Sequence, residues 1–150
     1  MPLHPGDPGC ICYRLRQTAR LISRTYDHFL APVGISIGQF GILATLAAMQ
    51  GSSISELADV LQMERTTLTR NLLPLKKLGY IEIEEGDDKR AKSLCLTRAG
   101  EKTLSDARPL WHAAQQSVEQ QLGKAEVQSL SKTLDGAMDR LSASAVKAVP

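Results

Sequence analysis

Length, composition and charge restrict what this chain can be. Its 150 residues, 43% of them hydrophobic, suffice for one compact domain with an apolar core, and we expect residues 1–150 to form a single domain. No run approaches the roughly 18 apolar residues of a membrane span, and the first residues lack the basic start and apolar stretch of a signal peptide, so we expect a cytoplasmic protein. The net charge of +2 is too small to indicate a nucleic-acid binder by itself.

The basic residues are unevenly placed along the chain. Residues 101–150 hold six basic and six acidic side chains, whereas residues 65–77 contain no acidic residue. The basic residues of that second segment are Arg65, Arg70, Lys76 and Lys77. A local excess of this kind is expected if one element faces phosphate and the rest of the molecule does not.

The cysteines and histidines do not form a recognisable site. The three cysteines are an odd number, and Cys10 and Cys12 lie two apart without a second pair, which argues against a disulfide framework or a zinc site. The histidines are scattered and no glycine-rich phosphate loop appears, so we expect neither a metal, nor a cofactor, nor enzymatic activity. A thiol peroxidase acting through Cys12 is the enzymatic alternative.

Two helices are predicted in the first third of the chain. Apolar residues recur at three- and four-residue spacing over residues 11–30, which predicts a long helix that Pro32 and Gly34 end. A second, largely apolar helix is predicted at residues 37–49, with Gly51 after it. This second helix should be buried.

A short helix, a tight turn and another helix are predicted next. Residues 53–56, Ser-Ile-Ser-Glu, form a capping box for a short helix that extends to about Leu61. After the turn, a helix at residues 65–78 carries leucines at helical spacing, and Gly79 ends it because glycine takes the left-handed conformation without steric cost.

A hairpin and two further helices complete the chain. Residues 80–84 alternate with period two and residues 93–96 can pair with them across a charged tip. Thr97 can then cap an amphipathic helix, which Pro109 should bend, and another amphipathic helix follows Gly123. Because the apolar stripes of these helices carry few polar residues suited to a site, we assign residues 10–31 and 101–146 to dimerisation.

The order of these elements predicts a mainly α fold with a small β-hairpin wing. It is a winged helix-turn-helix lobe at residues 36–98, with dimerisation helices on its N- and C-terminal sides. In such a lobe the helix from Arg65 enters the DNA major groove, where arginines pair with phosphate or guanine and threonines make short contacts. The predicted DNA contacts are Ser53, Arg65, Thr66, Thr67, Thr69, Arg70, Lys76, Asp88, Lys89, Arg90 and Lys92. The alternative is an ordinary solvated helix face.

At the tip of the hairpin, Arg90 is the predicted reader of the minor groove. The Asp88 carboxylate, two residues earlier, can orient the guanidinium group toward the concentrated negative potential of that groove. The alternative is a charged turn without a DNA contact, because Asp87 and Asp88 weaken the attraction to phosphate.

These motifs resemble a known family. Residues 88–90, Asp-Lys-Arg, followed by Leu-Cys-Leu-Thr-Arg-Ala-Gly at residues 94–100, resemble the D-x-R…L-T-x-x-G signature of the MarR family of regulators, and residues 79–81 resemble the family's entry to the wing. The similarity runs from about residue 10 to residue 141. It implies a dimer in which the first and last helices pack between subunits, two recognition helices set for a DNA palindrome, and repression relieved by a small molecule.

Two residues depart from the strongest form of this pattern. Pro74 lies inside the recognition helix, where it removes one backbone hydrogen bond, so we expect a modest bend after Asn71. Glu64 occupies the N-cap, where serine, aspartate or threonine would be stronger. Sequences of the family that this chain resembles do carry proline at the position of Pro74.

The resemblance also indicates where an effector would bind. Family effectors lie in the cleft between the dimer helices and the DNA-binding lobe, bordered here by Tyr13, Arg16, Ile37, Phe40, Trp111 and His112. Arg16 can hold a carboxylate while the rings enclose an aromatic body. The alternative is that these are core or interface residues, with Arg16 at the surface.

A thiol-based switch is the other regulatory hypothesis. Cys12, with Tyr26 fourteen residues later, resembles the reactive cysteine and partner tyrosine of the organic-hydroperoxide-sensing branch, and positive charge near a thiol favours its reactive form. Arg16 and Ile37, however, stand where that branch has two further tyrosines, which favours a buried, inert thiol.

Our leading hypothesis is a homodimeric repressor that a small aromatic or phenolic ligand releases from a palindromic operator. A helical interaction module without DNA binding is the alternative from another class.

Overall fold

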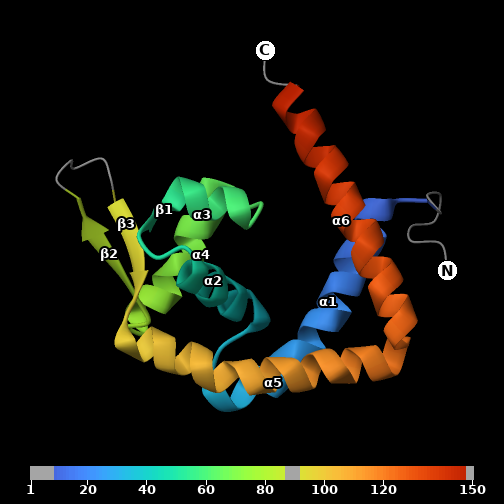
Figure 1. The fold of residues 1–150 in the computed structure, drawn as a ribbon, viewed down its shortest axis with the longest axis horizontal. Helices are drawn as coiled ribbons and strands as arrows, with labels where there is room; N and C mark the ends of the chain where they lie inside the picture. The colour runs from blue at the N-terminus through green and yellow to red at the C-terminus, as the bar shows by residue number, and fades with distance from the viewer. Residues whose placement is uncertain (1–8, 87–91, 148–150) are drawn as a thin grey trace.

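The computed structural model describes residues 9–86 and 92–147, in which helices predominate over a small antiparallel sheet (Figure 1). In chain order the elements are α1 (Ile11–Leu30), the 3₁₀ helix η1 (Ala31–Val33), α2 (Ile37–Ala48), β1 (Ser52–Ser53), α3 (Ile54–Val60), α4 (Arg65–Lys77), β2 (Ile81–Glu85), β3 (Lys92–Leu96), α5 (Arg98–Leu122) and α6 (Lys124–Lys147). Helices α2, α3 and α4 and the sheet form a compact lobe, and α5 runs from this lobe to the region of α1 and α6 (Figure 1). The mainly α fold with a small β wing is confirmed.

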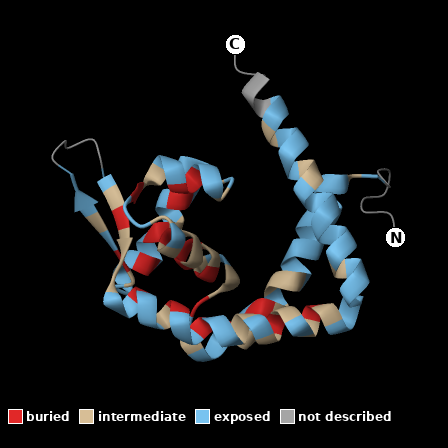
Figure 2. Ribbon diagram, viewed as in Figure 1, coloured by how far each residue is buried: buried red, intermediate tan, exposed pale blue. Residues whose placement is uncertain are grey.

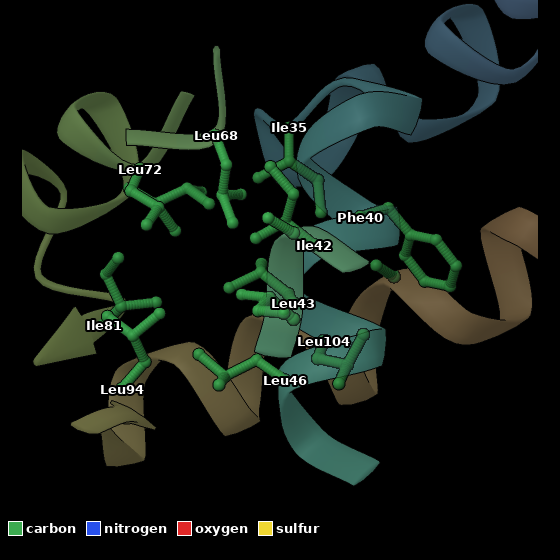
Figure 3. Packing of buried hydrophobic residues seen from close by; sticks show 14 of the residues in the cluster. Ile35, Phe40, Ile42, Leu43, Leu46, Leu68, Leu72, Ile81, Leu94 and Leu104 are labelled. Carbon is green, nitrogen blue, oxygen red and sulfur yellow. The ribbon is translucent and has the colours of Figure 1, made fainter. Parts of the chain in front are cut away.

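One apolar cluster holds the lobe together. Leu43 and Leu46 of α2 meet Leu68 of α4, Leu94 of β3 and Leu104 of α5, and all five side chains are buried (Figure 3). The leucine spacing predicted for α4 is confirmed, because its buried side chains are the three leucines that recur every three or four residues. Burial of this apolar surface fixes which face of α4 turns inward.

Two capping boxes set where α2 and α3 begin. The Ser53 hydroxyl accepts from the Glu56 amide at 3.1 Å, and the Ser53 amide donates to the Glu56 carboxylate at 2.8 Å, as predicted. Ser36 and Gln39 form an equivalent box at the start of α2, which sequence reasoning did not anticipate. Hydrogen bonds from Ser53 lower the pKa of Glu56, since they favour the ionised carboxylate.

The sheet has the strand order β1-β3-β2, and all its pairs are antiparallel. The predicted hairpin is confirmed, with Ile83 opposite Leu94 and Ile81 opposite Leu96. Strand β1 was not predicted, because two residues are too few to show an alternating pattern. Its pairing with β3 ties the start of α3 to the wing.

Both helices that contain an internal proline are continuous in the structure. Helix α4 runs through Pro74 to Lys77, and α5 runs through Pro109 to Leu122. The bends expected at these prolines stay predictions. Helix α1 has the predicted bounds, and α2 and α4 each end one residue earlier than predicted.

Outside the lobe, most of α6 and the first half of α1 are exposed (Figure 2). Tyr26 of α1 packs with Ala114 and Val118 of α5 in a small second cluster, but every residue from 11 to 21 is exposed. In α6, the apolar stripe is exposed or only partly buried within one chain.

No single described helix is both long and apolar enough to cross a membrane. The test of length and composition is met only by a pair of segments, α1 with η1 and then α2, which are bent by 73° relative to each other.

Candidate nucleic-acid interface

Helix α4 presents a polar and basic surface on the side opposite its buried leucines. Thr66, Arg70, Leu73 and Lys77 follow one another at intervals of four, three and four residues, which aligns them along one stripe of the helix. All four are exposed, and we call this stripe the outer face of α4. Within the described part of the chain, neither Arg70 nor Lys77 forms an ion pair. Their charges are therefore available to an external anion.

The remaining predicted contacts on α4 flank the outer face. Arg65, Thr67 and Lys76 are exposed. Thr69 is exposed as well, but its hydroxyl donates to the Arg65 carbonyl at 2.9 Å. That hydroxyl can therefore accept from a base or sugar but has already used its proton. Sequence reasoning identified most of this surface but did not select Leu73 or Lys77 as contacts.

The N-terminus of α4 has no side-chain cap. Glu64 stands at the N-cap as expected, and its side chain makes no capping hydrogen bond, while its carbonyl accepts from the Leu68 amide at 3.0 Å. The first amides of α4 lack intrahelical acceptors and carry partial positive charge. They are suited to a phosphate oxygen.

The turn between α3 and α4 depends on a strained residue. Gln62 has φ of 51°, a left-handed conformation that costs most residues roughly 1–2 kcal/mol. Its side-chain amide donates to the Asp59 carbonyl at 2.8 Å, and the next amide, of Met63, donates to the Ala58 carbonyl at 2.9 Å. These bonds hold the turn that sets α4 against α3. A glycine would have made this turn visible in the sequence.

Ser53 lies at the start of α3, and the capping box already uses part of its hydrogen-bonding capacity. Its hydroxyl oxygen accepts from Glu56, so only the hydroxyl proton is left for a DNA phosphate. On the wing, Lys92 is exposed at the first position of β3, opposite Glu85. The predicted contacts Asp88, Lys89 and Arg90, together with Asp87, lie outside the described residues.

A network of hydrogen bonds joins the end of α4, the base of the wing and the start of α5. The Thr97 hydroxyl donates to the Gly79 carbonyl at 2.5 Å and accepts from the Gly100 amide at 3.0 Å, so Thr97 caps α5 as predicted. The Tyr80 amide donates to the Leu75 carbonyl, and the Thr97 amide to the Tyr80 carbonyl, each at 3.0 Å. Gly79 has φ of 75°, the left-handed conformation predicted for it.

Gly100 is part of this hydrogen-bond network because it allows the backbone of Tyr80 to approach the start of α5 closely. A Cβ atom at Gly100 would lie 2.1 Å from the Tyr80 carbonyl oxygen, far inside contact distance. Sequence reasoning used this glycine only as part of a motif. Its physical role could not be found from local pattern, because the atom it avoids comes from another part of the chain.

The six predicted effector residues do not lie together within one chain. Phe40 of α2 stacks on Trp111 of α5 with ring centroids 5.8 Å apart, and Trp111 also contacts His112 edge-on at 4.9 Å. Ile37 packs against the same region. Tyr13 and Arg16, in contrast, lie on the exposed first half of α1. At ~1.5 Å rise per helical residue they are about 15–20 Å from Tyr26, which borders the aromatic group.

Within one chain Cys12 is exposed, whereas a buried thiol was expected. The reason is that the first half of α1 lies at the surface of the single chain, where every residue from 11 to 21 is exposed. About 21 Å of helix separates Cys12 from Tyr26 in one chain, and the Tyr26 hydroxyl donates to the side-chain carbonyl of Gln115. Burial, and secondarily the charge of Glu119, raise the pKa of Tyr26. No group of three or more potential metal ligands occurs among the residues that the structure describes.

Comparisons with known proteins agree with this arrangement. The sequence profile of the MarR family matches residues 33–91. An uncharacterized HTH-type transcriptional regulator, YwoH of Bacillus subtilis, is 30% identical over 96 residues, which cover 64% of this chain and 70% of YwoH.

Solved structures extend the likeness over most of the chain. The M. tuberculosis transcriptional regulator MosR, in complex with DNA, is 34% identical with a TM-score of 0.71, over 86% of this chain and 98% of MosR. The transcriptional repressor CouR, bound to a 23-mer DNA duplex, is 25% identical with a TM-score of 0.77, over 85% of this chain and 92% of CouR. Both resemble this chain in its lobe and in its flanking helices.

Proposed function

This chain belongs to the MarR family of DNA-binding transcriptional regulators, and we propose that it acts as a homodimeric repressor that leaves a palindromic operator when a small aromatic ligand binds. The relatives MosR and CouR bind DNA, and CouR is a repressor, which supports this role. We assign the main DNA contacts to the outer face and N-terminus of α4, including Arg65 and Arg70. The wing residues Asp88, Lys89 and Arg90 are proposed to contact the minor groove.

Uncovered apolar side chains outside the lobe support the dimer. The exposed residues are Ile11, Tyr13, Leu15 and Leu21 of α1, Leu122 of α5, and Leu130, Leu134, Met138 and Leu141 of α6. A groove of about 400 Å³ between α1 and α5 is lined in part by Leu21, Ile22 and Val118. Long helices depend on packing of their apolar face, and a second copy of the chain would supply the missing partner for these three helices.

A dimer accounts for a palindromic operator. Two chains related by a twofold axis present two copies of α4, so each can enter one half-site of a symmetric sequence. Basic residues concentrated on α4 then act at both half-sites, and binding should weaken steeply as salt rises.

The dimer is tested by placing a charge in the α6 stripe. Leu134→Glu would bury a carboxylate in the proposed interface, so we expect a monomer by light scattering and loss of operator binding in a gel shift. Gln128→Glu adds the same charge at an exposed position of α6 and should leave both unchanged. A Leu134→Glu variant that remains dimeric would contradict the proposed interface.

The effector is proposed to act at the aromatic group that joins α2 to α5. The stacked pair of Phe40 and Trp111 connects the lobe to the flanking helices, and Tyr26 of α1 lies beside it with ring centroids 6.5 Å from Trp111. A flat ligand that inserts here would change the position of the lobe relative to α1 and α5. The spacing of the two α4 helices in the dimer would change with it, and this would weaken operator binding.

Trp111, the only tryptophan in the chain, provides a direct measurement of this step. Titration with phenolic acids should quench its fluorescence over the same concentration range in which the operator is released. Phe40→Leu should weaken both responses. Release of DNA without any change in Trp111 fluorescence would argue against a ligand at this place.

A further inference from the structure

Leu73 is an apolar residue on the outer face of α4, in the middle of an otherwise polar stripe. Its side chain is 61% exposed, although the other leucines of α4 that follow the helical core spacing are buried. It lies between Arg70 and Lys77, three residues after the first and four before the second. The fold therefore does not use Leu73, since it contributes nothing to the core.

The surroundings of Leu73 are basic. Arg70, Leu73, Pro74, Lys76 and Lys77 line an open groove of about 860 Å³ along α4. None of its three cations forms an ion pair within the described residues, and α4 itself carries no acidic residue. The three cations and the exposed Leu73 side chain together fit an anion that also offers an apolar contact. A second copy of this surface would bring like charges together and does not fit.

Duplex DNA meets both requirements. Its phosphates match the cations, and the one apolar group on its major-groove edge is the C5-methyl of thymine. The other base edges there present polar donors or acceptors, which a leucine would desolvate without replacing their hydrogen bonds. We propose that Leu73 packs on a thymine C5-methyl group and thereby selects thymine at one position of each operator half-site.

This inference rests on the proposed operator binding and adds a position to it. Leu73 lies seven residues after Thr66, about 10 Å along the helix axis. At ~3.4 Å per base pair, the selected thymine is roughly three base pairs from the base nearest Thr66. Arg70 and Lys77, on either side, hold the backbone in register.

Replacement of thymine by deoxyuridine tests the contact, because it removes only the C5-methyl. The operator is first selected from random duplex DNA with the wild-type protein, and each thymine is then replaced singly by deoxyuridine. We expect about a fourfold loss of affinity at one position per half-site, the effect of one methyl-sized apolar contact. Leu73→Ala should bind the thymine and uracil operators equally.

Leu78→Ala is the matched control. Leu78 is the C-cap of α4 and is 51% exposed, but it lies off the outer face. This variant should keep the uracil sensitivity of the wild type, and both variants should unfold at the wild-type temperature because both side chains are largely exposed.

The outcomes separate the two proposals. A wild-type protein that selects no DNA overturns the operator binding and the thymine contact together. A wild-type protein that selects an operator but is insensitive to uracil at every position overturns only the thymine contact. So does a Leu73→Ala variant that retains the uracil sensitivity of the wild type.

Discussion

The lobe differs from the two helices α1 and α6 in how much of its apolar surface is covered within one chain. Within the lobe, Leu43, Leu57 and Leu68 have no exposed surface, and helices, turn and sheet close around them. In α6, Leu134 and Met138 stay exposed. The packing of the lobe is therefore complete within one chain. In the dimer that we propose, the exposed helices α1 and α6 are completed by the partner subunit, so their stability should vary with protein concentration.

The largest expected effect comes from a cavity in the lobe. Leu43→Ala should lower the free energy of unfolding by about 2–5 kcal/mol, because a fully buried leucine loses its packing. Leu134→Ala should instead shift the midpoint mainly at low protein concentration. Urea unfolding followed by circular dichroism at two concentrations measures both. Equal concentration dependence for the two variants would remove the distinction between the two regions.

The next effect concerns the hydrogen-bond network that joins α4, the wing and α5. Gly100→Ala places a methyl group against the Tyr80 carbonyl, so the backbone must shift at a cost of about 1–3 kcal/mol. Gly136→Ala in α6 is the control, because the nearest atom to its Cβ is a flexible Arg140 side-chain nitrogen at 3.9 Å. Alanine there should stabilise the helix by roughly 0.5–1 kcal/mol. Thermal unfolding compares them, and a stable Gly100→Ala protein would be the contrary result.

The effect expected at the DNA surface is on binding, with no loss of stability. Arg70→Ala should weaken operator binding by about 1–3 kcal/mol, and Lys76→Ala should weaken binding to all sequences alike while reducing the salt slope by about one. Arg108→Ala, an exposed arginine of α5, serves as the control. Fluorescence anisotropy over a salt series measures these changes. An unaltered salt slope in Lys76→Ala would exclude a phosphate contact there.

The smallest effect should come from the cap of α3, which positions α4 through the turn. Ser53→Ala should cost about 1 kcal/mol of stability near neutral pH. The lowered pKa of Glu56 means that the capping box stabilises the fold above the ordinary pKa of about 4.5 and loses this contribution as pH falls through the lower folded-state value. Ser53→Ala keeps the backbone amide that donates to this carboxylate, so the pH dependence is read from Glu56→Ala, whose difference from wild type should shrink in acid. Thermal unfolding over a pH series checks this, and a difference that grew in acid would contradict it.

Several features of the site could be read from local sequence pattern. The capping box at Ser53, the inward leucines of α4, the left-handed Gly79 and the cap at Thr97 were all predicted and are confirmed. Each depends on residues within four positions of one another. The geometry of the helix or turn alone then decides the outcome.

Other features depend on residues that are far apart in the chain. The effector residues were grouped by resemblance. In the structure Phe40 and Trp111 stack on each other, whereas Tyr13 lies in the exposed first half of α1, far from this pair. Cys12 is exposed because the rest of the chain does not cover the first half of α1. The apolar periodicity of the sequence cannot show this. Gln62 lacks the glycine signal of a left-handed turn, so only its measured φ identifies it.

By itself, the sequence determined the order and type of the elements, the inward face of α4 and the basic character of its other face, because caps and apolar periodicity act over a few residues. The tertiary structure decided what those elements place together and what they leave uncovered. It set Gly100 against Tyr80, stacked Phe40 on Trp111, and left Leu73 exposed among cations. Such contacts and exposures arise only when distant segments pack, since burial is a property of the whole fold.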